Sequence, residues 1–309
     1  MQTELSQIIE EALKVQCEEF TRLVEEAAQL LAEEDGQVGN FNVLGRFVKI
    51  KPLGEAIIVG DLHGDLESLV QILKETSFLH KMNQNNKNAL IFLGDYGDRG
   101  IYSAEVYHVV LKLKLLFPKQ VILMRGNHEG PEDLLASPHD LPTQFHERFG
   151  EKGREAYAKI RELFKHLYNA LLVEERYLMI HGGLPPEAKT IRDLAYAHIN
   201  HPKQRLLEDM LWSDPTEVIK GACESPRGAG KLFGENMTNE VLSRFDVKIL
   251  IRGHEPCRDG FKINHKGRVL TLFSRKGPPY FNINGSYLDV ELSRKFENAE
   301  QLIPFIHKF

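Results

Sequence analysis

Six side chains that could bind divalent metal ions stand just after short apolar runs of this sequence. The runs cover residues 56–59, 89–93, 121–124, 178–180 and 249–251. The candidate ligands that follow them are Asp61, His63, Asp95, Asn127, His181 and His254. Buried strands read as such apolar runs, and polar groups at strand ends gather where open α/β sheets bind ligands. The pattern therefore predicts an active site at the ends of strands.

These ligands are carboxylates, imidazoles and one amide oxygen, without any thiolate. Such a mixed set suits manganese, iron or zinc, and it is too rich in nitrogen for calcium. Six ligands exceed what one ion needs beside a reactive water, so we expect two ions about 3.5–4 Å apart, with Asp95 as the bridge. Each motif alone could be an ordinary turn, but five in order indicate a site.

The segments between the runs must position these side chains. Apolar residues recur with helical spacing over 66–73 and 106–116, so residues 56–125 read as strand, helix, strand, helix, strand. That order predicts parallel strands joined by right-handed crossovers. Residues 145–171 are expected to be helical, and the C-terminal part to be rich in strands, at 248–251, 261–264, 269–273 and 286–291.

Residues 4–34 carry an apolar stripe that predicts one long helix, ended by Asp35 and Gly36. Residues 1–35 hold ten acidic and two basic residues, a net charge of -8, whereas the rest holds 34 acidic and 37 basic residues, a net charge of +3. Two interpretations stay open: a layer packed on the body, or a docking or dimerisation helix. We expect packing in cis, away from the metals.

The bulk properties exclude several classes of protein. A near-neutral body argues against nucleic-acid binding, which needs a basic face. No apolar stretch approaches the roughly 20 residues that span a bilayer, and the N-terminus has no signal-peptide pattern. The three cysteines (Cys17, Cys223 and Cys257) form no Cys-x-x-Cys pair, which fits a reducing compartment. We therefore expect a cytoplasmic protein that binds neither membrane nor nucleic acid.

Residues 60–64, 94–100, 126–129, 181–183 and 252–255 resemble the signature blocks of the phosphoprotein phosphatase family. These are the metal-dependent Ser/Thr phosphatases within the calcineurin-like metallophosphoesterases. Two further stretches, residues 211–215 and Arg227-Gly228 followed by Phe233-Gly234, resemble blocks typical of Ser/Thr protein phosphatases. The resemblance covers about residues 50–290, and the N-terminal helical segment lies outside it.

The fold that this resemblance implies is α/β (α+β), with a central β-sandwich of mixed sheets flanked by helices. We expect a metallophosphoesterase catalytic domain over residues 45–309. Residues 1–44 are expected to form an N-terminal helical extension.

The resemblance also implies a role for each site residue. One metal ion would be held by Asp61, His63 and Asp95, and the other by Asp95, Asn127, His181 and His254. His128 would be the general acid that protonates the leaving oxygen, with Asp98 fixing its orientation. Arg99 and Arg227 would clamp the phosphoryl oxygens, because the guanidinium fork matches phosphate geometry. A metal-bridging hydroxide would attack in line, without a phosphoenzyme.

One loop departs from the family pattern. Residues 275–280 replace the usual Ala-Pro-Asn-Tyr-Cys-Gly, so inhibitor sensitivity is not carried over. Tyr280 is the candidate for the tyrosine that overhangs the substrate, and Arg275 and Lys276 are expected to add positive charge.

Several other polar residues have ordinary interpretations. Arg125 and Arg252 are expected to hold carboxylates behind the ligands, with phosphate binding as the alternative. Asp65 is expected to cap the following helix. Trp212 is read as core or rim packing. Four histidines without a motif are read as surface or structural residues: His139, His146, His198 and His201.

These observations predict a metal-dependent protein Ser/Thr phosphatase that uses two divalent ions, manganese first, with iron or zinc possible. Its partners would be phosphorylated proteins or peptides, and regulatory subunits could bind it. One alternative is a small-molecule metallophosphoesterase, such as a dinucleoside polyphosphate hydrolase. Another is a non-catalytic scaffold, against which the complete ligand set with His128 and Asp98 argues.

Overall fold

Two large β-sheets, joined by one shared core, organise the protein in a computed structural model that describes residues 2–309. The five-stranded sheet has the order β16 (Ile306–Lys308), β15 (Ser286–Glu291), β4 (Glu55–Val59), β5 (Ala89–Phe92), β6 (Val121–Leu123). The eight-stranded sheet has the order β1 (Gly36–Val38), β2 (Phe41–Leu44), β3 (Phe47–Ile50), β7 (Ala170–Val173), β8 (Tyr177–Ile180), β12 (Ile249–Arg252), β14 (Val269–Leu272), β13 (Phe261–Asn264). A small third sheet has the order β10 (Ala222–Glu224), β11 (Lys231–Phe233), β9 (Asp214–Pro215).

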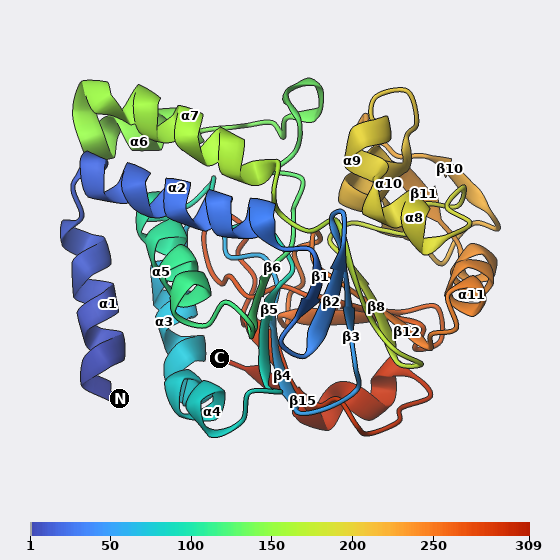
Figure 1. The fold of residues 1–309 in the computed structure, drawn as a ribbon. Coiled ribbons are helices and arrows are strands. Elements are labelled where there is room, and N and C mark those ends of the chain that lie inside the picture. Colours follow the sequence, from blue (N-terminus) through green and yellow to red (C-terminus); the bar gives the residue numbers. More distant parts are fainter. Residues whose placement is uncertain (1) are drawn as a thin grey trace.

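Helices cover the outer sides of both large sheets (Figure 1). Those beside the five-stranded sheet are α3 (Leu66–Glu75), α4 (Phe78–Gln84) and α5 (Ser103–Leu116). Those beside the eight-stranded sheet are α8 (Ile191–Ala195), α9 (Ala197–Asn200), α10 (Leu206–Trp212) and α11 (Glu235–Arg244). The remaining body helices are α6 (Leu141–Phe149) and α7 (Gly153–Phe164), with short 3-10 turns at Glu132–Leu134, Gly150–Lys152 and Ala299–Phe305.

Strands β4, β5 and β6 are parallel, so the predicted strand-helix alternation over residues 56–125 is confirmed. Their registers align Val59 with Phe92 and Phe92 with Leu123. Because the three strands end side by side, the loops that follow them meet at one edge of the sheet. That edge is where the candidate ligands stand.

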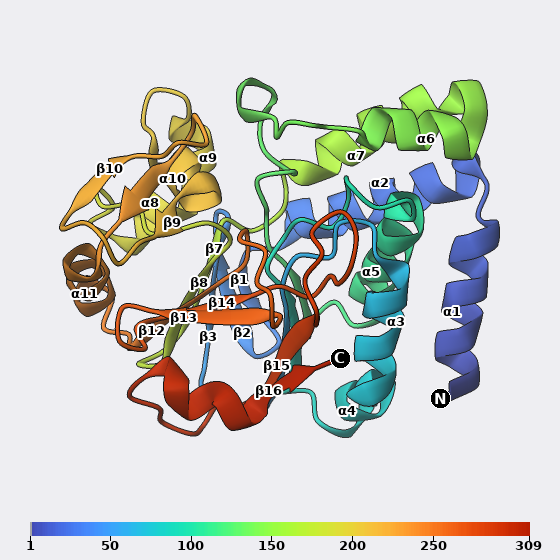
Figure 2. The same cartoon turned by 180° about the vertical axis from the view of Figure 1, so that it is seen from behind.

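Alternating side chains of the eight-stranded sheet enter two different cores. In β7, Leu171 and Val173 join the core shared with the five-stranded sheet, whereas Ala170 and Leu172 join the core under α8–α11. Successive side chains of a strand point to opposite faces, so a strand buried on both faces is apolar throughout. The expected sandwich of mixed sheets flanked by helices is therefore confirmed, and Figure 2 shows the chain passing from β14 in one sheet to β15 in the other.

The predicted helix over residues 4–34 is two helices, α1 (Gln2–Lys14) and α2 (Cys17–Glu33). The break has a local cause, because Gln16 caps α2 in a capping box with Glu19. Residues 36–44 differ more, since they form β1 and β2 and not helix. These strands extend the eight-stranded sheet, so the N-terminal segment is helical only up to Glu33.

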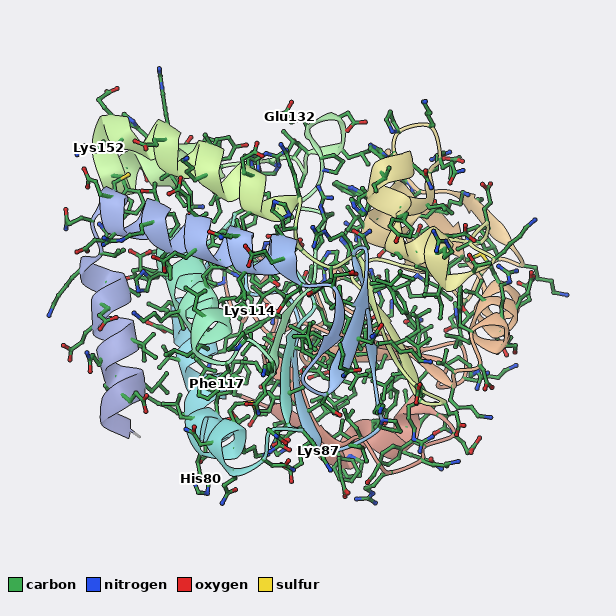
Figure 3. The ribbon with its side chains drawn as sticks, viewed as in Figure 1. His80, Lys87, Lys114, Phe117, Glu132 and Lys152 are labelled. Atoms are coloured by element: carbon green, nitrogen blue, oxygen red, sulfur yellow. The ribbon has the colours of Figure 1, made fainter. Side chains whose placement is uncertain are left out.

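Both N-terminal helices pack on the body, as expected, because α1 contacts α5, and α2 contacts α5 and α7. Phe20 is fully buried between Phe145 and Phe149. Figure 3 shows Lys152 beside the start of α2, where its side chain pairs with Glu18. None of the described helices combines the length and apolar character needed to cross a bilayer.

A buried ion pair that the sequence did not reveal anchors the end of α2. Lys114 is fully buried, with its Nζ 2.6 Å from Glu34 Oε1, and it also donates to the carbonyls of Pro118 and Val121 (Figure 3). The Tyr168 hydroxyl donates to the other oxygen of Glu34. Burial lowers the pKa of Lys114, and the Glu34 carboxylate opposes that shift.

Replacing Glu34 by alanine should lower the free energy of unfolding by about 3 kcal/mol, because it leaves a buried ammonium without its counter-charge. Urea denaturation measures this loss. Glu33→Ala, at the adjacent exposed position, should change the free energy by no more than about 0.5 kcal/mol. Equal stability of the two variants would show that the pair does not hold α2 on the body.

Candidate active site

The two large sheets bring the six candidate ligands to one place. Loops after β4, β5 and β6 supply Asp61, His63, Asp95 and Asn127, and loops after β8 and β12 supply His181 and His254. All six side chains are buried. Ligand atoms of Asp95, His181 and His254 lie within 4.8 Å of one another. His63 and Asp95 lie within the same limit of His128, which is the predicted general acid and not one of the ligands.

Asp95 lies between the two groups of ligands. Its Oδ2 is 3.5 Å from His63 Nε2 and 3.4 Å from His181 Nε2. On one side, His63 Nε2 is 3.7 Å from Asp61 Oδ2. On the other, Asn127 Oδ1 is 3.0 Å from His181 Nε2 and 2.9 Å from His254 Nδ1. The central position of Asp95 is the one that a bridging ligand requires.

Backbone carbonyls orient two of the imidazoles. His63 Nδ1 is 3.1 Å from the Gly97 carbonyl, and His181 Nδ1 is 2.9 Å from the Leu93 carbonyl. A carbonyl can only accept, so each Nδ1 carries a proton and Nε2 is the ring atom that would bind a metal ion. Both Nε2 atoms face the carboxylates, as in metal sites where a second partner fixes the tautomer.

Three observations show that these residues fit divalent metal ions. Burial and the neighbouring Asp95 carboxylate raise the pKa of Asp61 to about 7, which is the response of buried carboxylates that lack a counter-charge. His181 Nε2 and His254 Nδ1 both face the Asn127 side-chain oxygen, so three possible ligand atoms meet at one point. A Cβ at Gly126 or Gly253 would overlap a carboxylate oxygen of Asp95 or Asp61, so the backbone leaves room only for the ligands. The set of donors suits hard to intermediate cations.

The ligand loops have strained backbone, and a buried glutamate holds the Asp95 loop in place. His63, Asp95 and His254 have φ values of 45°, 58° and 73°, in the left-handed region that non-glycine residues rarely adopt. Glu129 Oε2 accepts hydrogen bonds from the backbone N–H groups of Asp95 and Gly126, at 2.8 and 3.0 Å. No role was predicted for Glu129 from the sequence, although it belongs to the motif of residues 126–129.

His128 is placed as a general acid would be. Its Nδ1 is 2.6 Å from Asp98 Oδ2, which leaves Nε2 free to give a proton. Burial lowers the pKa of His128, but the Asp95 and Asp98 carboxylates outweigh it, so the pKa lies above its ordinary value. Burial raises the pKa of Asp98, but hydrogen bonds from His128 and His139 outweigh it and hold that pKa well below its usual range.

A cleft of about 460 Å³ opens over this centre. Its lining includes the two predicted phosphate-binding arginines, Arg99 and Arg227, together with Asn127 and His128. Tyr280 also lines it, with its ring centroid 5.3 Å from that of His63, so the loop brings a tyrosine over the site as expected. The roles of these residues in substrate binding stay predictions. All four residues predicted to bind the substrate line the cleft: Arg99, Asn127, Arg227 and Tyr280.

Asp214 holds Arg227 at the cleft. The sequence analysis named the block of residues 211–215 that contains Asp214, but it predicted no role for this residue. Its Oδ2 pairs with Arg227 Nε, and its Oδ1 is 3.0 Å from Arg252 Nη2. Burial raises the pKa of Asp214, but His254 and the two arginines outweigh it and lower the pKa to about 2. Arg252 is fully buried, and Arg125 donates to the Glu129 carbonyl. Both arginines therefore support the ligand loops and do not face the cleft.

The remaining expectations have mixed outcomes. Asp65 caps α3 by accepting from Ser68 N–H, as predicted, and Trp212 lines the cleft against His254.

Arg275 does not add charge to the cleft, because it is buried and donates to the carbonyls of His63 and Pro278. His139 was read as ordinary, yet it contacts Asp98. No motif surrounds it, so no signal in the sequence could have found it.

A sandwich of mixed sheets whose strand ends hold an Asp, His and Asn cluster under a cleft with two arginines defines a metallophosphoesterase. A family model described as calcineurin-like phosphoesterase matches residues 56–258. A probable serine/threonine-protein phosphatase of Encephalitozoon cuniculi is 34% identical over 243 residues, which are 76% of this chain and half of that protein. The serine/threonine-protein phosphatase 4 catalytic subunit of Eremothecium gossypii is 31% identical over 77% of this chain and 75% of its own.

A solved structure extends the similarity to nearly the whole fold. It is a protein serine/threonine phosphatase of Saccharomyces cerevisiae with similarity to human phosphatase PP5. Its TM-score is 0.76 at 23% identity, and the match covers 98% of this chain and 95% of that one. The chain belongs to the calcineurin-like phosphoesterase family and, within it, to the serine/threonine protein phosphatases. The expected family and enzyme class are therefore confirmed.

Proposed function

We propose that this protein hydrolyses phosphoserine and phosphothreonine in phosphorylated proteins, with manganese as the first candidate for its two metal ions. The observation that carries the proposal is His128, held by Asp98 beside the ligand cluster, in a cleft that Arg99 and Arg227 line. Similarity to phosphatase catalytic subunits supports protein substrates and leaves room for regulatory subunits. A cytoplasmic location stays a prediction from the sequence.

One ion would be held by Asp61, His63 and Asp95, and the other by Asp95, Asn127, His181 and His254. Bound divalent ions would supply positive charge for the phosphoryl oxygens and make a bound water more acidic.

The chain's own residues then have separate tasks. Arg99 and Arg227 bind the phosphoryl oxygens and stabilise the charge that builds on them. His128 Nε2 gives a proton to the serine or threonine oxygen as its bond to phosphorus breaks, while water forms the new bond to phosphorus. Asp98 keeps the Nδ1 proton of His128 directed away from the cleft.

A substrate panel tests the proposal. Metal-stripped protein, re-loaded with Mn²⁺, Fe²⁺ or Zn²⁺, is assayed for phosphate release from phosphoserine and phosphothreonine peptides, and for cleavage of dinucleoside polyphosphates. His128→Asn serves as the control for contaminating phosphatases. We expect the highest kcat/KM on the peptides with Mn²⁺. A preference for the dinucleotides would establish the small-molecule alternative, and inactivity with every ion would indicate a scaffold.

Replacing Arg227 by alanine should lower kcat/KM by about 100-fold, because it removes a donor to the charge that develops on phosphorus. Inhibition by inorganic phosphate should weaken as well. Metal content should stay the same, since Asp214 keeps its bond to Arg252. Arg154→Ala, at an exposed position of α7, provides the control. Unchanged phosphate inhibition would mean that other residues bind the phosphoryl group.

A further inference from the structure

Asp98, which orients the general acid His128, also contacts a second histidine, His139. Asp98 Oδ2 is 2.6 Å from His128 Nδ1 and 2.7 Å from His139 Nδ1. A carboxylate with a depressed pKa accepts only, so both Nδ1 atoms donate to the same oxygen. His139 Nε2 lies 2.9 Å from the hydroxyl of Tyr157 on α7. Four side chains thus form one row, from His128 at the cleft to Tyr157 outside it.

The carboxylate of Asp98 is fixed at both oxygens. Oδ1 accepts the backbone N–H of Leu141 at 2.7 Å, and Oδ2 accepts from His139. Because Leu141 and His139 each donate a hydrogen bond to a different oxygen of Asp98, the orientation of the carboxylate plane does not depend on His128. Without His139, the only remaining partner of Oδ2 among the described side chains would be His128 itself.

The segment of residues 137–141, which contains His139, also forms hydrogen bonds with Arg99, the residue after Asp98. The Asp140 carboxylate accepts the backbone N–H of Arg99 at 3.0 Å, and the Ser137 carbonyl accepts from Arg99 Nη2 at 3.2 Å. Asp98 and Arg99 have φ values of 65° and 71°, a conformation that costs about 1–3 kcal/mol per residue unless its surroundings impose it. Residues 137–141 therefore hold this turn, together with Ser103, whose Oγ accepts the backbone N–H of Asp98 at 3.1 Å.

We propose that His139 is a positioning residue for the general acid: it orients Asp98, and through Asp98 it directs Nε2 of His128 at the leaving oxygen. The inference rests on the proposed role of His128. It assigns to His139 an effect on the step in which the leaving group departs, and none on the binding of the phosphoryl group. Tyr157 supports His139 from α7.

The experiment uses the full chain and phosphate monoesters whose leaving groups differ in basicity, from an activated aryl phosphate to an alkyl phosphate. Removing a partner that orients a metal ligand typically costs about 10–100-fold in activity, and we expect the same order for a partner that orients the general acid. His139→Ala should therefore lower kcat on the alkyl phosphate by about 10-fold or more and on the aryl phosphate by much less, with KM unchanged. His139→Asn, which keeps a donor near the position of Nδ1, should restore most of the loss.

Two further variants test whether the effect passes through Asp98. In an Asp98→Asn background, His139→Ala should add no further loss, because the residue on which it acts is already changed. Tyr157→Phe should give a smaller loss of the same kind and serves as the second variant if His139→Ala does not fold. His146→Ala, an exposed histidine on α6, is the matched control.

Equal losses of kcat on the aryl and alkyl phosphates would overturn the proposal and leave His139 a structural residue. So would a full loss in His139→Asn, or additive losses with Asp98→Asn. None of these results depends on whether the natural substrate is a phosphoprotein. The peptide panel decides that separately, with the wild-type protein.

Discussion

Replacing His128 by asparagine should slow the hydrolysis of a phosphoserine peptide by about 10²–10⁴-fold, the usual contribution of general acid catalysis. The serine alkoxide is a poor leaving group, so it needs the proton that His128 Nε2 provides. An activated aryl phosphate leaves without such help, and its hydrolysis should slow much less. Steady-state kcat on the two substrates measures the difference.

The metal content of the His128→Asn variant should equal that of the wild type, because it is the backbone N–H of His128 that contacts Asp95, at 3.0 Å from Oδ1. His146→Asn, at an exposed position, is the control for a histidine without a role. If the peptide and the aryl phosphate lose activity equally, His128 is not the group that protonates the leaving oxygen.

The Asp95→Asn variant should lose bound metal and phosphatase activity together, and its loss of activity should exceed that of His128→Asn. Asp95 Oδ2 faces both His63 and His181, so this one carboxylate serves both groups of ligands. Asparagine keeps an oxygen for the N–H of His128 but removes the negative charge that holds the cations. Elemental analysis of the purified protein gives the metal content, and circular dichroism should show that the fold survives.

An exposed aspartate provides the matched comparison, since Asp35→Asn should retain both ions and full turnover. Retention of two tightly bound ions with near-normal turnover in Asp95→Asn would remove this residue from the bridging role. Loss of only one ion would place Asp95 in a single ligand group.

Elements with a strong local pattern were predicted well. Strand β4 was expected from its apolar run because a strand buried on both faces has no polar alternation, and the same holds for β8 and β12. The C-terminal strands β13, β14 and β15 were also predicted near their observed positions.

Strand β7 was missed, because its apolar sequence also fits a buried helix. Residues 145–171 were expected to be helical, but α7 ends at Phe164 and residues 170–173 form β7 between β3 and β8. Strand β3 pairs in parallel with β7, so Phe47 lies opposite Ala170. An apolar run as short as residues 170–173 does not by itself distinguish a buried strand from a buried helix, and here the neighbouring strands decide its conformation.

The candidate ligands were identified from the sequence itself. Asp61, Asp95, Asn127, His181 and His254 each stand within a few residues of a buried strand end, and parallel strand ends meet at one edge of a sheet. Local order along the chain therefore predicts that Asp61, Asp95 and Asn127 converge at the edge of one sheet, whereas the packing of the two sheets brings His181 and His254 to the same place.

What surrounds the ligands was decided only by the tertiary structure. The bond from His139 to Asp98 joins residues 41 positions apart, and the contact of Arg275 with the His63 carbonyl joins residues 212 positions apart. Such bonds depend on the angle at which two loops approach, and neither periodicity nor a motif encodes that angle. The sequence therefore determined which groups could do the chemistry, and packing of the two sheets decided which groups hold them in position.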